Sequence, residues 1–398
     1  MNADVIVVGL GAMGSAACFQ LAKRGASVIG IDRYSPPHTF GSTHGETRIT
    51  RQAIGEGEHF VPFALRSYEI WREIEAETGE DLLTVTGGLI IAGVSGHSLH
   101  GSEDFLQTTI DAAVKYGITH RTLDAGEIAA EFPQFTVDGG ERAYYEDAAG
   151  FLRPEACVAA QLGLAEKLGA TLRRNERVVR IKENGNGVKV VTDRGSYTAG
   201  RAIVSAGPWV NELFPDASLG LFKVYRQVLH WFDVADAYES FALGRSPIFV
   251  WACGRGEDDF FYGFPAIGGP SGGIKIATEV FDEPTVADDA DREVSAEEPA
   301  ELFNRYVSGR LKGVGEKCLK SAVCLYTMTP NSNFVIDRIS EKVIVASPCS
   351  GHGFKHSAAI GESLAELSLI ARTTIDMSPF SLTRFSDQKK SLSEKSIR

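Results

Sequence analysis

Apolar runs and glycine turns alternate over the first thirty or so residues of the chain. The run at Asp4–Val8 is rich in β-branched residues and too short for a helix, so it predicts a buried strand. After a glycine turn, the pattern predicts a helix over Ser15–Lys23 and then a second apolar run that ends at Asp32. This order of strand, turn, helix and strand is typical of a βαβ unit.

The pattern downstream predicts further helices and strands in alternation. Helices are expected at Pro62–Glu77 and Glu155–Leu168, and a glycine turn after Ser350 leads into another long helix. Strands are expected at Gly87–Gly93, Val178–Thr192, Ala202–Ser205, Phe222–Asp233, Pro247–Ala252 and Asp259–Phe264, with two more inside Asn331–Ala346. Because strand patterns return in the middle of the chain, we expect the first domain to be interrupted by a second, antiparallel one.

The first turn carries the glycine spacing of a dinucleotide-binding site. Gly9, Gly11 and Gly14 form G-x-G-x-x-G where the strand turns into the helix. They allow a tight turn, a close approach to a pyrophosphate and close packing of helix on strand. Asp32 follows Gly9 by 23 positions, near the roughly 20 expected for a carboxylate that binds ribose hydroxyls. An acid there disfavours a 2′-phosphate, so FAD or NAD is expected rather than NADP; the alternative is a glycine-rich turn of an ordinary doubly wound sheet.

Composition narrows the class of protein. With 398 residues, 43% of them hydrophobic, the chain is expected to fold into two domains. A net charge of −12 argues against nucleic acid or an anionic membrane as a partner. The apolar N-terminal run lacks a basic flank, so neither a signal peptide nor a membrane span is expected. Six scattered cysteines without metal-ligand spacing fit a cytoplasmic protein with no metal site.

Seven short motifs resemble those of one enzyme family. GSTHGETRITR at Gly41–Arg51 and GEGEHFVP at Gly55–Pro62 are similar to the flavin-contacting loop of the monomeric sarcosine oxidase and N-methyltryptophan oxidase family. Five further motifs follow in family order: AGPWV at 206–210, FYGFP at 261–265, CLYTMTPNSNFVID at 324–337, SGHGFKHS at 350–357 and SPFSLTRF at 378–385. The resemblance covers nearly the whole chain and implies an FAD-dependent oxidase that converts secondary amines to imines and O2 to hydrogen peroxide.

The resemblance also implies the fold. It is an α/β fold of two domains, in which a glutathione-reductase-like, Rossmann-type FAD-binding domain is interrupted by an antiparallel-sheet substrate domain, and the chain is expected to be a monomer. The FAD-binding domain would take residues 1–86, 150–219 and 322–386, the substrate domain 87–149 and 220–321, and a polar tail 387–398.

Site residues carry over one by one from these motifs. Cys324 resembles the cysteine that bonds covalently to the flavin 8α-methyl group, a reaction that needs access and cationic neighbours; without its motif it would be read as a buried, inert thiol. Arg51 and Lys355 resemble the pair that clamps the substrate carboxylate, and Lys275 resembles the lysine that promotes electron transfer to O2. The alternative for these three cations is a solvated surface position.

Other residues are implied as the surroundings of the flavin and the substrate. His44 and Arg48 resemble residues packed on the isoalloxazine ring, and Tyr262 and Tyr326 resemble aromatic walls of the substrate cavity or, alternatively, core tyrosines. His352 is expected to be structural. Cofactor contacts are expected at Gly9, Gly11, Ala12, Met13, Gly14, Asp32, Arg33, Ser42, Thr43, Arg48, Ala206, Gly207, Trp209, Cys324, Gly351, Gly353, Phe354 and Lys355.

Two departures from the family pattern leave the substrate open. Glu279 stands where the sarcosine oxidase pattern has a histidine, and Ile54 replaces a tyrosine. An acid near the amine would favour a cationic or polar substrate side chain, or it would point away on the other face of the strand. The remaining rivals are a cyclic imino-acid oxidase, a flavin amine dehydrogenase, a flavin-binding protein without turnover and an NAD-linked dehydrogenase.

Overall fold

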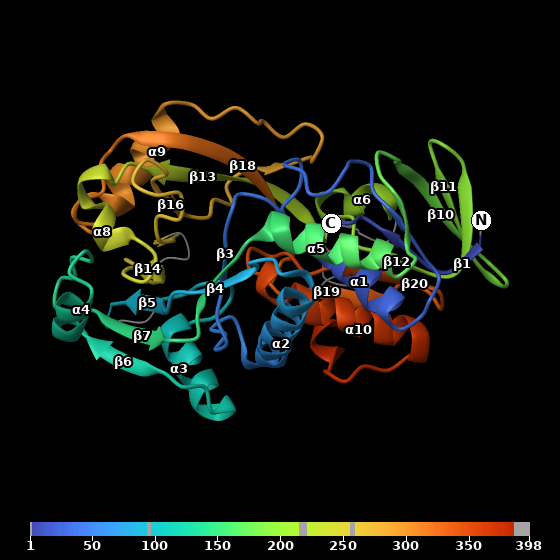
Figure 1. Ribbon diagram of the computed structural model, residues 1–398, viewed down its shortest axis with the longest axis horizontal. Coiled ribbons are helices and arrows are strands. Elements are labelled where there is room, and N and C mark those ends of the chain that lie inside the picture. Colours follow the sequence, from blue (N-terminus) through green and yellow to red (C-terminus); the bar gives the residue numbers. More distant parts are fainter. Residues whose placement is uncertain (1, 94–96, 215–220, 255–258, 386–398) are drawn as a thin grey trace, which may run out of the picture.

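The computed structural model describes residues 2–93, 97–214, 221–254 and 259–385, and the polar tail predicted at 387–398 lies outside them. Two large sheets lie at opposite ends of the molecule (Figure 1). The α/β class is confirmed, and each sheet contributes one wall of the candidate site.

The first sheet is built on the predicted βαβ unit. Its strand order is β10-β11-β12-β1-β2-β9. In addition, β20 pairs with β12 on one side and with β19 on the other. The neighbours β1–β2, β1–β12, β12–β20 and β2–β9 are parallel, whereas β10–β11–β12 form an antiparallel meander. The strands span Asn2–Val8 (β1), Val28–Ile31 (β2), Thr171–Arg173 (β9), Val178–Asn184 (β10), Gly187–Thr192 (β11), Ser196–Val204 (β12), Val335–Arg338 (β19) and Val343–Ser347 (β20).

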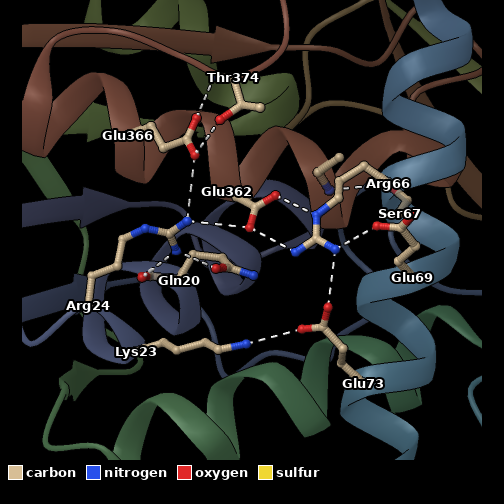
Figure 2. A network of polar contacts seen from close by, with 11 residues as sticks. Gln20, Lys23, Arg24, Arg66, Ser67, Glu69, Glu73, Glu362, Glu366 and Thr374 are labelled. Carbon is tan, nitrogen blue, oxygen red and sulfur yellow. Dashed lines mark hydrogen bonds and ion pairs between the residues drawn. The ribbon is translucent and has the colours of Figure 1, made fainter.

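Four helices pack together beside this sheet. They are α1 (Ala12–Lys23), α2 (Val61–Thr78), α5 (Pro154–Lys167) and α10 (Ser357–Ile370). The close approach of α10 to α1 needs Gly361, because a Cβ there would lie 2.3 Å from the Cβ of Ala16. Figure 2 shows the polar network that joins α1, α2 and α10, in which Glu362 accepts two hydrogen bonds from Arg66, at 2.8 and 3.0 Å.

The second sheet is mostly antiparallel. Its order is β17-β13-β16-β15-β14-β5-β7-β6, with β18 on the other side of β13, and β14 runs parallel to β5. Its strands are β5 (Gly88–Ala92), β6 (Arg121–Asp124), β7 (Arg142–Glu146), β13 (Lys223–Phe232), β14 (Ile248–Ala252), β15 (Phe260–Gly263), β16 (Ile274–Ala277), β17 (Pro284–Thr285) and β18 (Cys318–Met328). Phe249, Trp251 and Phe261 fill the core on one face of this sheet.

Short elements complete the chain. A small three-stranded sheet in the order β3-β8-β4 combines Arg48–Thr50, Gly150–Leu152 and Leu83–Val85. The remaining α-helices are α3 (Phe105–Tyr116), α4 (Ala125–Glu131), α6 (Val210–Leu213), α8 (Tyr238–Phe241) and α9 (Glu297–Leu302). None of the helices in the described residues has the length and apolar character needed to cross a membrane.

Candidate active site

One large cavity touches both sheets. It encloses about 1860 Å³, part of it open to solvent, with Val8 and Ile31 of the first sheet at one end and Val250 and Tyr262 of the second at the other. Most of the predicted site residues line it: Gly9, Gly11, Ala12, Met13, Asp32, Arg33, Ser42, Thr43, Arg48, Arg51, Ala206, Gly207, Trp209, Tyr262, Lys275, Tyr326, Gly351, Gly353, Phe354 and Lys355. Gly14, His44 and Cys324 are not part of its surface.

The glycine turn after β1 is shaped by close backbone contacts. Gly9 has a φ of +86°, a conformation that side chains disfavour. A Cβ at Gly14 would lie 1.7 Å from the carbonyl oxygen of Gly9, so the helix can start against the turn only with glycine there. Gly14 therefore acts by packing, behind the cavity surface.

Asp32 directly follows β2 at the cavity and fixes the loop around it. Its carboxylate accepts hydrogen bonds from the backbone N–H groups of Leu10, at 2.7 Å, and Tyr34, at 2.8 Å. Burial raises the pKa of Asp32, although these two amides oppose the rise. The next residue, Arg33, lies 5.0 Å from the ring of Trp209 and pairs with Asp288 at 3.0 Å.

These features fit a bound FAD. The glycine turn leaves backbone exposed at the N-terminus of α1, where the helix dipole favours phosphate. Asp32 lies on the cavity surface at the position of a ribose-binding acid. His44 does not reach the cavity surface, and its buried Nε2 has no hydrogen-bond partner among the described residues. The donor set and the shape of the cavity thus suit a dinucleotide that ends between the sheets.

Cys324 lies in β18 and does not reach the cavity surface. Its Sγ is 3.5 Å from Nη2 of Arg48 and donates to the carbonyl oxygen of Ser42 at 3.6 Å. Burial raises the pKa of the thiol, whereas Arg48 and Lys275 lower it. The cationic neighbourhood expected for a reactive cysteine is present, but the access that attachment also requires is closed in this structure.

Lys275 projects from β16 and is buried on the wall of the cavity. Its Nζ donates to the carbonyl oxygens of Gly45, at 2.8 Å, and Thr47, at 2.6 Å, and it lies 4.1 Å from the ring centre of Phe264. Burial shifts the pKa of Lys275 well below its usual value, and Arg48 adds to that shift. The predicted oxygen-activating lysine is therefore a buried residue and not an exposed strand lysine.

Arg51 and Lys355 meet at a single carboxylate, that of Glu56. Arg51 Nη2 is 2.5 Å from Oε2 of Glu56, and Lys355 Nζ is 3.0 Å from its Oε1. All three side chains are almost completely buried. Lys355 also donates to the carbonyl oxygen of His352, at 2.9 Å. The two predicted clamp residues thus grip a carboxylate in this structure, and it belongs to the protein itself.

The ionisation of this cluster follows from burial and mutual attraction. Burial opposes the charge of Glu56, but Arg51 and Lys355 hold its pKa well below the usual value. Burial lowers the pKa of Lys355 to about 8, even though Glu56 opposes that shift. The clamp is therefore charged at neutral pH and loses charge in mildly alkaline solution.

A second buried pair lies next to the clamp. His100 Nε2 is 2.6 Å from Oε2 of Glu279, and His100 Nδ1 is 3.8 Å from Oε1 of Glu56. Although burial opposes it, attraction to Glu279 and Glu56 raises the pKa of His100 to about 9. Glu279 lines the cavity together with His100, so it does not point away on the other face of the strand. His352 stacks on His100 with 5.2 Å between ring centres, and its pKa lies well below the usual value, mainly because of burial.

The two predicted aromatic walls lie side by side. The hydroxyl oxygens of Tyr262, in β15, and Tyr326, in β18, are 3.4 Å apart, and both residues line the cavity. Burial raises the pKa of each hydroxyl, so both stay protonated at physiological pH.

Sequence reasoning missed Glu56 and His100 as site residues. Glu56 stands within the motif GEGEHFVP, five positions after Arg51, so the spacing offered a clue. His100 lies in an irregular segment before α3, and nothing in its local sequence distinguishes it. No three His, Cys, Asp or Glu side chains gather into a metal site within the part of the chain that the structure describes.

Comparison with known proteins decides the family. The family model described as FAD dependent oxidoreductase matches residues 4–367. The chain belongs to this family. It is 37% identical over 373 residues to the monomeric sarcosine oxidase of Streptomyces avermitilis, covering 93% of this chain and 94% of that protein. It is also 35% identical to the N-methyl-L-tryptophan oxidase of Yersinia pestis, with coverages of 97% and 100%.

A solved structure shows the same fold. The open form of NikD, an amino acid oxidase essential for nikkomycin biosynthesis, superimposes with a TM-score of 0.80 at 23% identity, covering 96% of this chain and 97% of that one. The resemblance predicted from the motifs, the two-domain fold and the dependence of this oxidoreductase on FAD are thereby confirmed.

Proposed function

We propose that this FAD-dependent oxidoreductase is an oxidase of secondary amines that carry a carboxylate, such as N-methyl or other N-alkyl amino acids. The observation that carries the proposal is the convergence of buried Arg51 and Lys355 on one carboxylate inside the cavity. Two buried cations at one point suit an anionic substrate group. The named activities of the sarcosine and N-methyltryptophan oxidase relatives support the same substrate class.

The protein's own residues would bind and orient the substrate. The substrate carboxylate would take the place that Glu56 holds at the clamp. Glu56 must therefore give up part of its contact with Arg51 and Lys355 when substrate binds. Tyr262 and Tyr326 would hold the N-alkyl group beside the cofactor and exclude water, which converts an encounter into a reactive geometry. The chemistry that FAD would supply when bound is acceptance of a hydride equivalent from the N-alkyl carbon, which with loss of the amine proton leaves an imine; water hydrolyses this imine to an aldehyde and a primary amino acid.

Lys275 has a separate part in this proposal. It is a buried lysine whose Nζ is fixed by two carbonyl oxygens on the wall of the cavity. A fixed positive charge would stabilise negative charge that develops on O2 as it is reduced to hydrogen peroxide.

A substrate panel tests the function. We expect hydrogen peroxide from sarcosine or other N-methyl amino acids and far less from amines of similar size without a carboxylate, such as dimethylamine and N-methylethanolamine. Electron transfer only to an artificial acceptor would identify an amine dehydrogenase, and a preference for proline or pipecolate would identify a cyclic imino-acid oxidase.

The covalent link is a further part of the proposal. We place the bond at Cys324 because of its motif and because Arg48 stabilises a thiolate there. For attachment, the loop at Ser42 and the side chain of Arg48 that cover the thiol must move, because the thiol is buried in the structure described here. Acid precipitation of the yellow protein should leave flavin in the pellet, and Cys324→Ser should release it.

The domain boundaries, the monomeric state and the cytoplasmic location expected from the sequence belong to the same proposal. The boundary expected between residues 321 and 322 falls inside β18, which begins at Cys318 and pairs with β13 of the second sheet. The next two strands, β19 and β20, belong to the first sheet. Limited proteolysis tests the boundaries, and sedimentation equilibrium tests the monomer.

A further inference from the structure

One buried ion pair in the cavity is not used by the clamp or by the groups around Cys324. It is the pair of His100, from the segment before α3, and Glu279, just after β16. Their side chains are 8% and 4% exposed, and both line the cavity. A buried ion pair is costly to form, and it adds little stability relative to apolar residues of the same size. Its place in the cavity wall therefore calls for another explanation.

The two carboxylate oxygens of Glu279 have different surroundings. Oε2 accepts the hydrogen bond from His100 at 2.6 Å. Oε1 accepts no hydrogen bond from the residues that the structure describes. Glu279 lines the cavity, and glycine at position 351 leaves room for its carboxylate, because a Cβ there would lie only 2.9 Å from Oε1. Oε1 is thus an open acceptor on the wall of the cavity.

The charges around the cavity limit what a ligand can bring. The cluster around the clamp consists of three cationic side chains, Arg51, Lys355 and His100, and two carboxylates, Glu56 and Glu279; Lys275 lies outside it, bound to the carbonyl oxygens of Gly45 and Thr47. One positive charge is left over, and a single substrate carboxylate balances it. A second carboxylate or a cationic side chain on the substrate would leave a net charge in a buried site, which is unfavourable.

An apolar side chain would also fit poorly here. It would cover Oε1 of Glu279 and leave a buried acceptor without a partner, at a cost of roughly 1–3 kcal/mol. A hydroxyl or carboxamide would instead donate a hydrogen bond to it. A site built to hydrogen-bond a polar group of its substrate strongly rejects an analogue that lacks this group. An apolar pocket discriminates much less between ligands of similar size.

We propose that His100 and Glu279 form a side-chain subsite that selects N-alkyl amino acids with an uncharged, hydrogen-bond-donating side chain. This inference rests on the proposed function, because it assumes that the carboxylate binds at Arg51 and Lys355. Glu279 contacts the substrate, and His100 is a positioning residue that holds Glu279 by its other oxygen.

Binding of two isosteric, non-oxidisable acids to the holoenzyme tests the subsite. Succinamate carries a carboxylate and an NH2 donor, whereas levulinate has a methyl group in place of that NH2. By isothermal titration calorimetry we expect succinamate to bind the wild type at least about tenfold more tightly than levulinate. In Glu279→Leu the ratio should fall to about one, and in the exposed neighbour Glu283→Leu it should stay at the wild-type value.

The controls separate this inference from the proposed function. If Glu279→Leu does not fold because His100 is left uncompensated, the double variant His100→Leu/Glu279→Leu removes both charges and should also give a ratio of about one. Equal binding of the two acids by the wild type, or tighter binding of succinate than of succinamate, would overturn the subsite. Loss of both acids in Arg51→Met, with peroxide formed from N-methyl amino acids by the wild type, would show that the proposed function holds whatever the ratio is.

Discussion

Arg51 gives the most direct test of the clamp. It is buried, it pairs with Glu56 at 2.5 Å and its guanidinium lies 5.1 Å from the ring of Phe105. Removing one charge-assisted hydrogen bond to a ligand costs roughly 1.5–3 kcal/mol, so Arg51→Met should weaken carboxylate binding and raise the apparent KM by roughly 10- to 150-fold.

The matched control is Arg72→Met, which removes an exposed arginine from α2. It should leave KM unchanged. An Arg51→Met enzyme with the wild-type KM for every amino acid would show that the substrate carboxylate binds elsewhere.

The pKa of Lys355 gives a pH dependence with a definite sign. Burial lowers that pKa to about 8, so Lys355 is charged below pH 8 and neutral above it. The affinity for a simple carboxylate such as acetate should therefore be constant below about pH 7 and fall as the pH rises through 8. Titration of the flavin absorbance with acetate across this range measures the change.

The control variant for this effect is Lys355→Arg, since a guanidinium keeps its charge throughout the range. It should remove the fall near pH 8 and leave only a change near pH 9 from His100. A wild-type affinity that does not vary between pH 7 and 9 would contradict the assignment of Lys355 to the clamp.

At the residue scale, the sequence revealed those groups that belong to contiguous motifs. Arg51, Lys275, Cys324 and Lys355 were found because each stands in a recognisable stretch of sequence. His100 could not be found in this way, because its partner Glu279 is 179 positions away and the pairing exists only after folding. The hydrogen bond from Lys275 to the carbonyl oxygen of Gly45 likewise depends on tertiary structure.

At the element scale, Gly14 sets how α1 meets β1. Its missing Cβ allows contact with the carbonyl oxygen of Gly9, since an added Cβ would lie only 1.7 Å away. Gly14→Ala should therefore displace the start of α1, abolish tight FAD binding and lower the melting temperature, as measured by flavin content and thermal unfolding. Gly163→Ala, inside α5 with open space around it, should stabilise the protein by roughly 0.5–1 kcal/mol. Full FAD retention in Gly14→Ala would contradict the packing argument.

The polar network in Figure 2 should stabilise the helix layer. Arg66 on α2 and Glu362 on α10 form a two-point hydrogen bond, and both side chains are partly buried. A double-mutant cycle with Arg66→Met and Glu362→Gln should give a coupling of about 1 kcal/mol in urea unfolding. The exposed pair Lys115–Glu58 should give a smaller coupling. Equal couplings for the two pairs would show that the network does not tie the helices together.

Predicted elements succeeded where local pattern decides structure. β1 and α1 of the βαβ unit, α2 and α5 all match the expected ranges to within a few residues, because their glycines and apolar periods are local features. The long strand β18 was not predicted, although its motif was recognised, because its pairing with β13 is a long-range interaction. The helix α3 and the strands β6 and β7 were not predicted either.

At the scale of the whole molecule, the fold brings two kinds of surface to one cavity. The parallel sheet supplies a glycine turn, Asp32 and the start of α1, which suit a dinucleotide. The second sheet supplies Tyr262, Lys275 and Tyr326, while the segments that follow β3 and β20 supply the clamp. The division of labour between the sheets was predictable from the interrupted pattern of the chain, but the geometry of their junction was not.

Anaerobic mixing of the purified holoenzyme with sarcosine, followed by admission of oxygen, tests the central claim most directly. The flavin absorbance near 450 nm should bleach without oxygen and return when oxygen enters, with one hydrogen peroxide formed for each flavin reoxidised. The Arg51→Met enzyme should bleach only at much higher substrate concentration. If neither sarcosine nor any other N-alkyl amino acid bleaches the flavin, the protein is not an oxidase of carboxylated secondary amines.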